Sequence, residues 1–216
     1  MRVAARIPFW VVVLLSLPLT AAFRDSTADE ALDTVTQLKP NVSHGRDLFD
    51  TCAACHGNTG AGVSDGTVPA IAGQHFRVIV AAIIDFRNDN RLDPRMKHFT
   101  DEHHLSVAQD IADVATYVSR LQPTRSSAHG DGSHVARGSA IYRADCVSCH
   151  GAHAEGSDKE RYPRLAGQHY EYLIHELRDA TAGRRPSLAY NHVQLLERLQ
   201  PSDIVGVSDY LSRLGP

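Results

Sequence analysis

Two copies of one short pattern constrain this chain more than any other feature of its sequence. Cys-x-x-Cys-His occurs at residues 52–56 and again at residues 146–150, and each copy is followed directly by glycine. Two thiols at this spacing lie about one helical turn apart, so that both can form thioethers to the vinyl groups of one haem. The histidine that follows is then placed to bind the iron as its proximal ligand. The pattern predicts two covalently bound haem c groups.

A single copy of the motif would leave two other interpretations open, a thioredoxin-like redox pair or one half of a zinc site. The second copy, within a long repeat, favours haem. The chain has only these four cysteines, so that haem attachment leaves none for a disulfide. The residues predicted to hold the haems are Cys52, Cys55 and His56 for the first, and Cys146, Cys149 and His150 for the second.

The N-terminus has the pattern of a secretory signal peptide. Arg2 and Arg6 precede an apolar run over residues 8–19, and small residues follow at 20–22. This predicts export to the periplasm. Prolines interrupt the apolar run, and it is shorter than a membrane-spanning helix requires. The alternative interpretation is an uncleaved N-terminal anchor. The formal net charge of −3 provides no basic field for nucleic acid.

A long internal repeat surrounds the two motifs. Shifting the chain by 94 residues aligns residues 52–105 with residues 146–199 without a gap, and 14 of these 54 positions are identical. Closer to the C-terminus, residues 111–121 match residues 204–214 once one residue is removed. Two copies are too few for a solenoid, so the repeat predicts two globular haem domains side by side.

The repeat and the local composition divide the chain into five parts. Residues 23–43 are polar and lack periodicity, which predicts a mobile N-terminal stretch. Residues 122–134 contain the proline, serine and glycine typical of a linker. The predicted boundaries are 1–22 for the signal peptide, 23–43 for the flexible segment, 44–121 for haem domain 1, 122–134 for the linker and 135–216 for haem domain 2.

Apolar residues at helical spacing predict helices around each motif. A polar loop is expected over residues 88–97, and Ser202 is expected to cap the last helix after Pro201. The predicted helices are 45–51, 76–86 and 107–121 in the first copy, and 138–145, 170–177 and 202–214 in the second.

At this point the chain resembles a known family. Two Cys-x-x-Cys-His motifs 94 residues apart, each followed by Pro-x-x-Ala-Gly-Gln-His and a tyrosine-containing last helix, are similar to the dihaem cytochrome c4 family over residues 44–215. The resemblance implies an all-α fold of two tandem class I cytochrome c domains, related by a pseudo-twofold axis, with the haem edges near the domain interface. It also implies periplasmic electron transfer, and similar dihaem units serve as haem subunits of larger dehydrogenases.

The distal ligand departs from the family pattern, which places a methionine seven residues before the leucine that opens the last helical segment. The chain's only methionines are Met1 and Met96. His98 and His192 align in the repeat at the family's methionine register, whereas Met96 aligns with Tyr190. We therefore predict His/His coordination at both irons, with Met96 as the alternative distal ligand of haem 1. Two imidazoles leave a haem at lower potential than His/Met ligation.

The repeat also places other polar residues near the haems. His75 and His169 are expected to form hydrogen bonds near the domain interface or a haem propionate. Arg91 and Arg185 could pair with propionates through bidentate contacts, and a surface role is nearly as well supported.

These features predict an electron carrier and not an enzyme, because two six-coordinate irons leave no open position for a substrate. The expected partners are redox proteins, a donor and an acceptor, such as a membrane oxidoreductase or a dehydrogenase; neither nucleic acid nor a small-molecule substrate is expected. Two alternatives stay open. One is a catalytic dihaem protein with an open or labile iron, of the peroxidase or thiosulfate-oxidising type. The other is the haem subunit of a dehydrogenase complex.

Overall fold

The computed structural model describes residues 20–124 and 128–215, with the backbone alone for residues 20–27. Most of the predicted signal peptide, residues 1–19, lies outside the described residues. The described chain is all-α, as predicted, and among its helices none is long and apolar enough to cross a membrane. In chain order its elements are α1(Thr20–Gln37), α2(Val42–His56), α3(Phe76–Arg87), α4(Pro94–Phe99), α5(Ala108–Arg120), α6(Val135–Ile141), the π-helical turn η1(Tyr142–Cys146), α7(Val147–His150), α8(Tyr170–Thr181), α9(Tyr190–Leu196) and α10(Pro201–Arg213).

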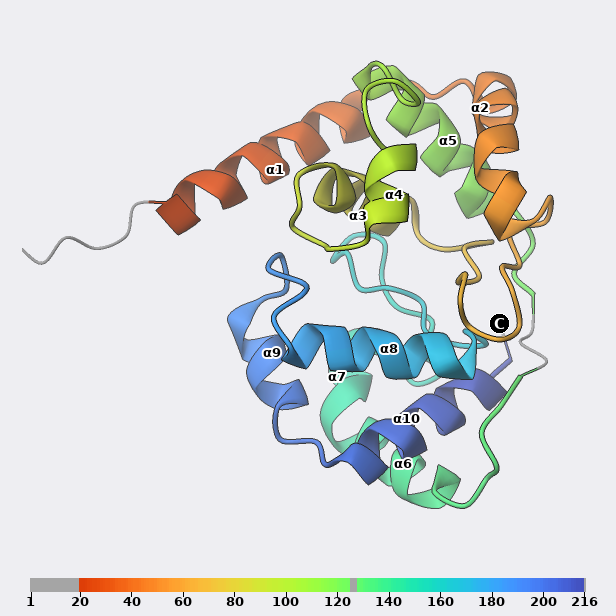
Figure 1. Cartoon of the computed structure of the whole chain (residues 1–216), viewed down its shortest axis with the longest axis vertical. Coiled ribbons are helices and arrows are strands. Elements are labelled where there is room, and N and C mark those ends of the chain that lie inside the picture. The colour runs from red at the N-terminus through yellow and green to blue at the C-terminus, as the bar shows by residue number, and fades with distance from the viewer. Residues whose placement is uncertain (1–19, 125–127, 216) are drawn as a thin grey trace, which may run out of the picture.

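The helices form two bodies, one above the other in Figure 1. We call α1 to α5 domain 1 and α6 to α10 domain 2. In each domain the helix before the haem motif packs against the last helix, α2 on α5 and α6 on α10. Glycine makes both crossings close. A Cβ on Gly45 would lie 2.1 Å from the carbonyl oxygen of Asp113. A Cβ on Gly138 would lie 1.9 Å from that of Gly206.

A one-residue insertion distinguishes the two motif-bearing segments. Gly45 precedes the first cysteine of its motif by seven positions, whereas Gly138 precedes the corresponding cysteine by eight. The π-helical turn η1 takes up the extra residue, because such a turn holds one more residue than an α-helical turn. The crossing glycine and the haem motif thereby both keep their places. This explains why the N-terminal end of the repeat matches at a shift of 93 residues and its centre at 94.

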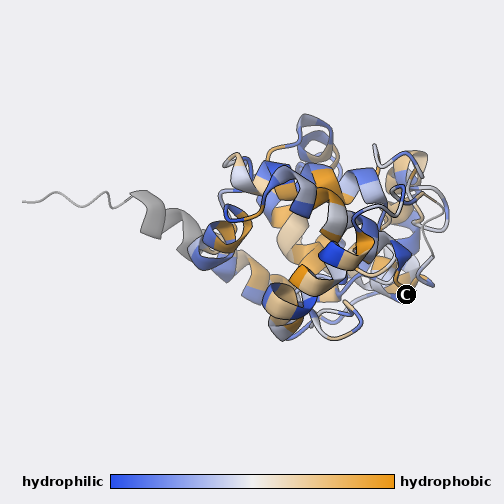
Figure 2. Ribbon diagram, turned by 90° about the horizontal axis from the view of Figure 1, so that it is seen from below, coloured by the Kyte–Doolittle hydropathy of each residue, from blue (hydrophilic) through white to orange (hydrophobic). Residues whose placement is uncertain are grey.

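The apolar faces of the helices meet in a core, as their spacing predicts. In α3 the residues Val80, Ile83 and Ile84 are buried. They pack against Phe49 of α2 and the apolar face of α5. Figure 2 shows hydrophobic segments, in orange, gathered between the helices. The helices predicted over residues 76–86 and 107–121 are therefore confirmed as α3 and α5, with ends that differ by one residue.

The N-terminal stretch differs from its prediction. Residues 23–43 are predicted to be mobile and unpatterned, yet residues 23–37 belong to helix α1 and residues 42–43 to helix α2. Leu32 and Val35 of α1 are buried, at 4% and 2% exposure, in the core of domain 1. The helix has too few apolar residues to show clear periodicity in the sequence. Its place is decided by the surface of α3 and α5, on which these two side chains pack.

Two local predictions were also wrong. The segment expected to be a polar loop over residues 88–97 contains the start of helix α4, with Asp93 as its N-cap and Pro94 in its first turn. Proline is well tolerated at this position because no intrahelical hydrogen bond is lost there. In α10 the N-cap is Gln200, not Ser202, and Pro201 is again in the first turn.

Candidate haem-binding sites

The proximal half of each site is built in the same way. Nδ1 of His56 lies 3.0 Å from the carbonyl oxygen of Pro69, and Nδ1 of His150 lies 3.1 Å from that of Pro163. In this hydrogen bond Nδ1–H donates, which leaves Nε2 with its lone pair for a metal. Burial lowers the pKa of both imidazoles, and both therefore stay neutral, as a metal ligand must.

Glycine shapes the loop that supplies the proximal carbonyl. Gly62 has φ +69° and donates its N–H to the carbonyl oxygen of His56 at 2.9 Å. A Cβ at this position would lie 2.4 Å from the carbonyl oxygen of Val68. Gly156 repeats this arrangement with His150 and Tyr162. The two glycines thus allow a tight turn that brings the Pro69 and Pro163 carbonyls back to the histidines.

All four motif cysteines are free thiols. Cys55 and Cys149 are exposed, whereas Cys52 and Cys146 are half-buried. Burial raises the pKa of each of the last two to about 11, so that they are neutral thiols at neutral pH. Free thiols beside a neutral, Nδ1-anchored imidazole fit the haem predicted from the motif, and they fit it equally in both domains.

On the distal side, domain 2 brings two histidines together. The rings of His150 and His192 have centroids 6.2 Å apart and an interplanar angle of 44°. With metal–nitrogen bonds of about 2 Å, two imidazoles on opposite sides of one metal ion have centroids about 6 Å apart. Burial, His150 and Arg185 together lower the pKa of His192. The rings of the two predicted ligands of haem 2 therefore lie at a separation that would suit one iron.

Domain 1 does not repeat this arrangement. The side chain of His98 is 64% exposed, with its Nδ1 3.7 Å from Asp101, and its ring packs on Phe99 and His104. Among the described ring contacts, His98 has none with His56. The exposed position of His98 does not fit the distal-ligand role predicted for it.

The helices show why the gapless alignment misleads at this point. Helix α4 begins at Pro94, so that Met96 is its third residue. Helix α9 begins at Tyr190, so that His192 is its third residue. The helix starts differ by 96 positions, two more than the repeat shift of 94. By position in the helix, Met96 corresponds to His192, and Met96 is partly buried whereas His98 is exposed.

The domains meet around a local twofold arrangement of glutamines. Gln74 donates to the carbonyl oxygen of Arg164 at 3.0 Å and accepts from its N–H at 2.9 Å. Gln168 does the same with Ala70, at 2.8 Å and 3.0 Å. Ala70 and Arg164 are repeat equivalents. Each glutamine therefore binds the residue that follows the proximal proline of the other domain.

The repeated histidines extend this interface. Nε2 of His75 lies 2.8 Å from the carbonyl oxygen of Glu155, and Nε2 of His169 lies 2.8 Å from that of Ala61. Glu155 and Ala61 are again repeat equivalents. The prediction that these histidines form hydrogen bonds near the domain interface is confirmed.

A buried ionic cluster also joins the domains. Glu176 of α8 accepts from Arg91 of domain 1 and Arg185 of domain 2, each at 2.7 Å. Arg91 also donates to the hydroxyl of Tyr172 at 2.5 Å. Burial disfavours the carboxylate, but the two guanidinium groups outweigh it and hold the pKa of Glu176 below its ordinary value. Nε of Arg185 is buried and has no hydrogen-bond partner.

Sequence reasoning identified the two arginines of this cluster but missed Glu176 and Tyr172. Neither has an identical partner in the repeat, since the positions 94 residues earlier are Ala82 and Val78. No signal in the sequence pointed to them.

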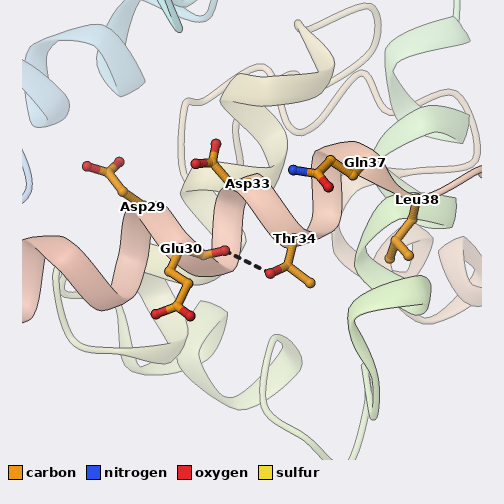
Figure 3. A pocket seen from close by; sticks show the side chains of 6 residues that line it. All are labelled: Asp29, Glu30, Asp33, Thr34, Gln37 and Leu38. Atoms are coloured by element: carbon orange, nitrogen blue, oxygen red, sulfur yellow. Dashed lines mark hydrogen bonds between the residues drawn. The ribbon is translucent and has the colours of Figure 1, made fainter.

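One surface hollow is unrelated to the motifs. It lies along α1 (Figure 3), lined by Asp29, Glu30, Asp33, Thr34, Gln37 and Leu38. The lining contains carboxylates without a repeated partner and no residue of either haem motif.

Comparison with known proteins agrees with this geometry. The family model described as cytochrome c matches residues 42–122 and again residues 135–214. Cytochrome c4 of Azotobacter vinelandii is 29% identical over 192 residues, which cover 81% of this chain and 89% of that protein. The thiosulfate dehydrogenase electron acceptor of Stutzerimonas stutzeri is 27% identical over 173 residues, covering 76% and 79%.

The fold has a solved counterpart. The structure of reduced recombinant cytochrome c4 from Pseudomonas stutzeri superposes with a TM-score of 0.74 at 23% identity, covering 82% of this chain and all of that one. The family match takes in both halves of the repeat and most of the chain. The chain therefore belongs to the cytochrome c family, as a cytochrome c4-like protein with two cytochrome c domains.

Proposed function

We propose that this protein is a periplasmic dihaem c-type cytochrome that carries single electrons between redox proteins, and that its two haems have different distal ligands. The observation that carries this proposal is the contrast between His192, which opposes His150, and His98, which faces outward. When bound, haem c supplies reversible one-electron transfer. The residues of the chain determine how readily each domain accepts the electron.

In domain 2 the proposed ligands are His150 and His192. The separation of their rings, 6.2 Å, and the neutral state that burial favours for both imidazoles support this pair. Nε of Arg185 is buried and unpaired next to this site, and it offers a donor to a haem propionate.

In domain 1 the proposed ligands are His56 and Met96. Met96 takes the helix position that His192 takes in domain 2, and it is less exposed than His98. The proposal thus keeps the predicted His/His pair at haem 2 and replaces it at haem 1 by the alternative, Met96.

Different distal ligands would give electron transfer between the two haems a preferred direction. A methionine ligand raises the potential of a haem relative to two imidazoles. Domain 1 is then the better electron acceptor, and electrons run from domain 2 to domain 1. Specific hydrogen bonds join the two domains close to their proximal sites. Each of Gln74 and Gln168 binds the backbone of the residue that follows the proximal proline of the other domain.

A second candidate function is to accept electrons from one particular dehydrogenase. One relative is named as the electron acceptor of a thiosulfate dehydrogenase. By this similarity the present chain would serve as the haem subunit or acceptor of a separate dehydrogenase, with domain 2 as its entry point. The apolar, Arg-bearing N-terminal segment supports export to the periplasm, where that partner would be met.

The test is near-infrared magnetic circular dichroism, with electron paramagnetic resonance, of the oxidised holoprotein. We expect one His/Met and one His/His haem in equal amounts, and two potentials that differ in a redox titration. Two His/His signals would support His98 as the distal ligand of haem 1 and would contradict a preferred direction of electron transfer based on different ligands. A high-spin signal from one haem would indicate an open iron and an enzyme.

A further inference from the structure

Three potential metal ligands gather on the surface of domain 1, at the C-terminal end of α4 and in the turn after it. They are His98, Asp101 and His104, and one ligand atom from each lies within 4.8 Å of the other two. Nδ1 of His104 is 2.9 Å from Asp101, Nδ1 of His98 is 3.7 Å from it, and the two rings are 4.8 Å apart. None of the three has a part in the haem sites proposed above.

The chain holds this cluster in place from both ends. The carboxylate of Asp101 accepts the backbone N–H groups of His103 and His104, at 2.9 Å and 3.2 Å. Arg87 of α3 donates to the carbonyl oxygens of Thr100 and Leu105, at 2.7 Å and 2.8 Å. The turn that carries Asp101 and His104 is therefore fixed to α3 on either side of these two ligands, and His98 lies in the last turn of α4. This reduces the cost of ordering the cluster around an ion.

The donor set selects the kind of ion. Two imidazoles and one carboxylate are the protein ligands of many zinc sites, with a fourth position left to water. Such nitrogen-rich sets favour zinc, copper or nickel over calcium and magnesium, which prefer oxygen. The side chain of His98 is 64% exposed, which leaves space around it for the small shift that would close the remaining separation to the other two ligands.

Domain 2 provides an internal comparison. The repeat equivalents of the three ligands are His192, Leu195 and Arg198, so that only one of the three positions keeps a ligand. The cluster therefore has no counterpart at the equivalent positions of domain 2, and among the described residues it is the one such group.

We propose that His98, Asp101 and His104 bind one divalent transition-metal ion of the zinc type at the surface of domain 1. The proposal rests on the proposed function in one respect, that Met96 and not His98 binds haem 1. The bound ion would lie one helix turn beyond Met96 along the chain, on the face of domain 1 that α4 presents to solvent.

The experiment is calorimetric titration of the haem-loaded protein with Zn²⁺. We expect one site per molecule, and we expect His98→Ala and His104→Ala each to weaken binding tenfold or more, the range found when partners of metal ligands are removed. His103→Ala is the matched control, since His103 is adjacent, exposed and outside the cluster, and it should bind as the parent does. No binding by the parent, or equal binding by the His98→Ala and His104→Ala variants, would overturn the proposal.

The same variants separate this proposal from the ligand assignment. Magnetic circular dichroism of the His98→Ala holoprotein should show an unchanged His/Met haem, which supports a free His98. Loss of one haem's low-spin signal in that variant would overturn both the assignment of Met96 and the zinc site. An unchanged spectrum together with absent zinc binding would overturn the zinc site alone.

Discussion

Domain 1 and domain 2 share their proximal sites and differ in the segments that follow α3 and α8. The hydrogen bond from the proximal histidine to proline is 3.0 Å in one and 3.1 Å in the other. On the distal side a histidine faces His150, whereas its repeat equivalent in domain 1 faces solvent. After duplication, the attachment chemistry tolerates little change, while the distal loop and the outer helices are free to diverge.

The cores diverge as well. The apolar cluster of domain 1 has twelve buried residues and includes two from α1, whereas that of domain 2 has six and no helix equivalent to α1. A small apolar core contributes less to stability. We therefore expect domain 2 to lose more stability than domain 1 when its haem is absent.

The comparison is tested most strongly by giving both domains the same ligand. We expect His192→Met to raise the lower of the two potentials by an amount of the order of 0.2 V, within the roughly 0.8 V over which axial ligands set haem potentials. The two potentials would then approach each other in a redox titration. His98→Met is the control, and it should leave both potentials in place. A shift with His98→Met and none with His192→Met would reverse the assignment of the domains.

The helix crossings test whether both domains rely on the same close contact. Gly138→Ala should destabilise domain 2 by about 3 kcal/mol or more, because the new Cβ would meet backbone at 1.9 Å and rigid backbone cannot move aside. Gly45→Ala should do the same in domain 1. Chemical denaturation with hydrogen exchange resolved by domain is the measurement.

Gly183→Ala is the control for the conformational effect of losing a glycine. Its φ is +73° but nothing lies within 4 Å of the position of the new Cβ, so that only a backbone cost of about 1 kcal/mol is expected. Equal effects at Gly138 and Gly183 would mean that the crossing has room to relax.

Helix α1 tests what domain 1 has and domain 2 lacks. Leu32→Ala should destabilise domain 1 by about 2 kcal/mol or slightly more, because it leaves a cavity in a core where Leu32 is 4% exposed. Hydrogen exchange in α3 and α5 should increase, with α8 and α10 unchanged. Thr34→Ala, on the exposed side of the same helix (Figure 3), is the control. Equal loss of protection in both domains would show that they unfold as one unit.

The smallest expected difference concerns pH. In domain 1 the buried Asp113 accepts from His44 at 2.8 Å, and this hydrogen bond raises the pKa of His44 above its ordinary value. In domain 2 the buried Asp209 accepts from the N–H of Gly132 and from Arg213. A histidine therefore pairs with this aspartate in domain 1 but not in domain 2.

The direction of this pH dependence of stability follows from the raised pKa of His44. The contribution of His44 is complete below its unfolded pKa of about 6.5 and is lost as the pH rises through the higher folded value. His44→Ala should remove this part of the pH dependence, measured as thermal stability between about pH 6 and pH 8. The matched control is His153→Ala, an exposed histidine of domain 2. The same pH dependence in parent and His44→Ala would show that the pair contributes nothing.

Much of the fold followed from the sequence because the responsible signals are local. The spacing within each Cys-x-x-Cys-His motif specifies the attachment of one haem. The apolar spacing that gives α3 and α5 depends on residues three and four apart. The repeat of His75 at His169 predicted equivalent hydrogen bonds of the two histidines near the domain interface, and the structure has them.

The distal ligand of domain 1 could not be obtained in that way. A gapless shift of 94 pairs His98 with His192, but α4 starts two positions earlier in its repeat than α9 does, at Asp93-Pro94. Residues two positions apart in an α-helix lie on nearly opposite faces. The displacement of two residues between α4 and α9 is therefore why we propose Met96, and not His98, as the ligand in domain 1. Helix α1 was missed for a related reason. Its few apolar residues show no clear helical spacing in the sequence, and their role is seen only where they pack on α3 and α5.

The sequence by itself determined the duplicated all-α architecture, the two attachment motifs and the proximal histidines, because each depends on covalent spacing or on neighbours within a turn. Only the tertiary structure decided that the His150 and His192 rings lie near each other whereas His98 is exposed, how η1 absorbs one extra residue, and that Glu176 joins two arginines from different domains. These features depend on distances between segments far apart in the chain, which packing sets and local pattern does not.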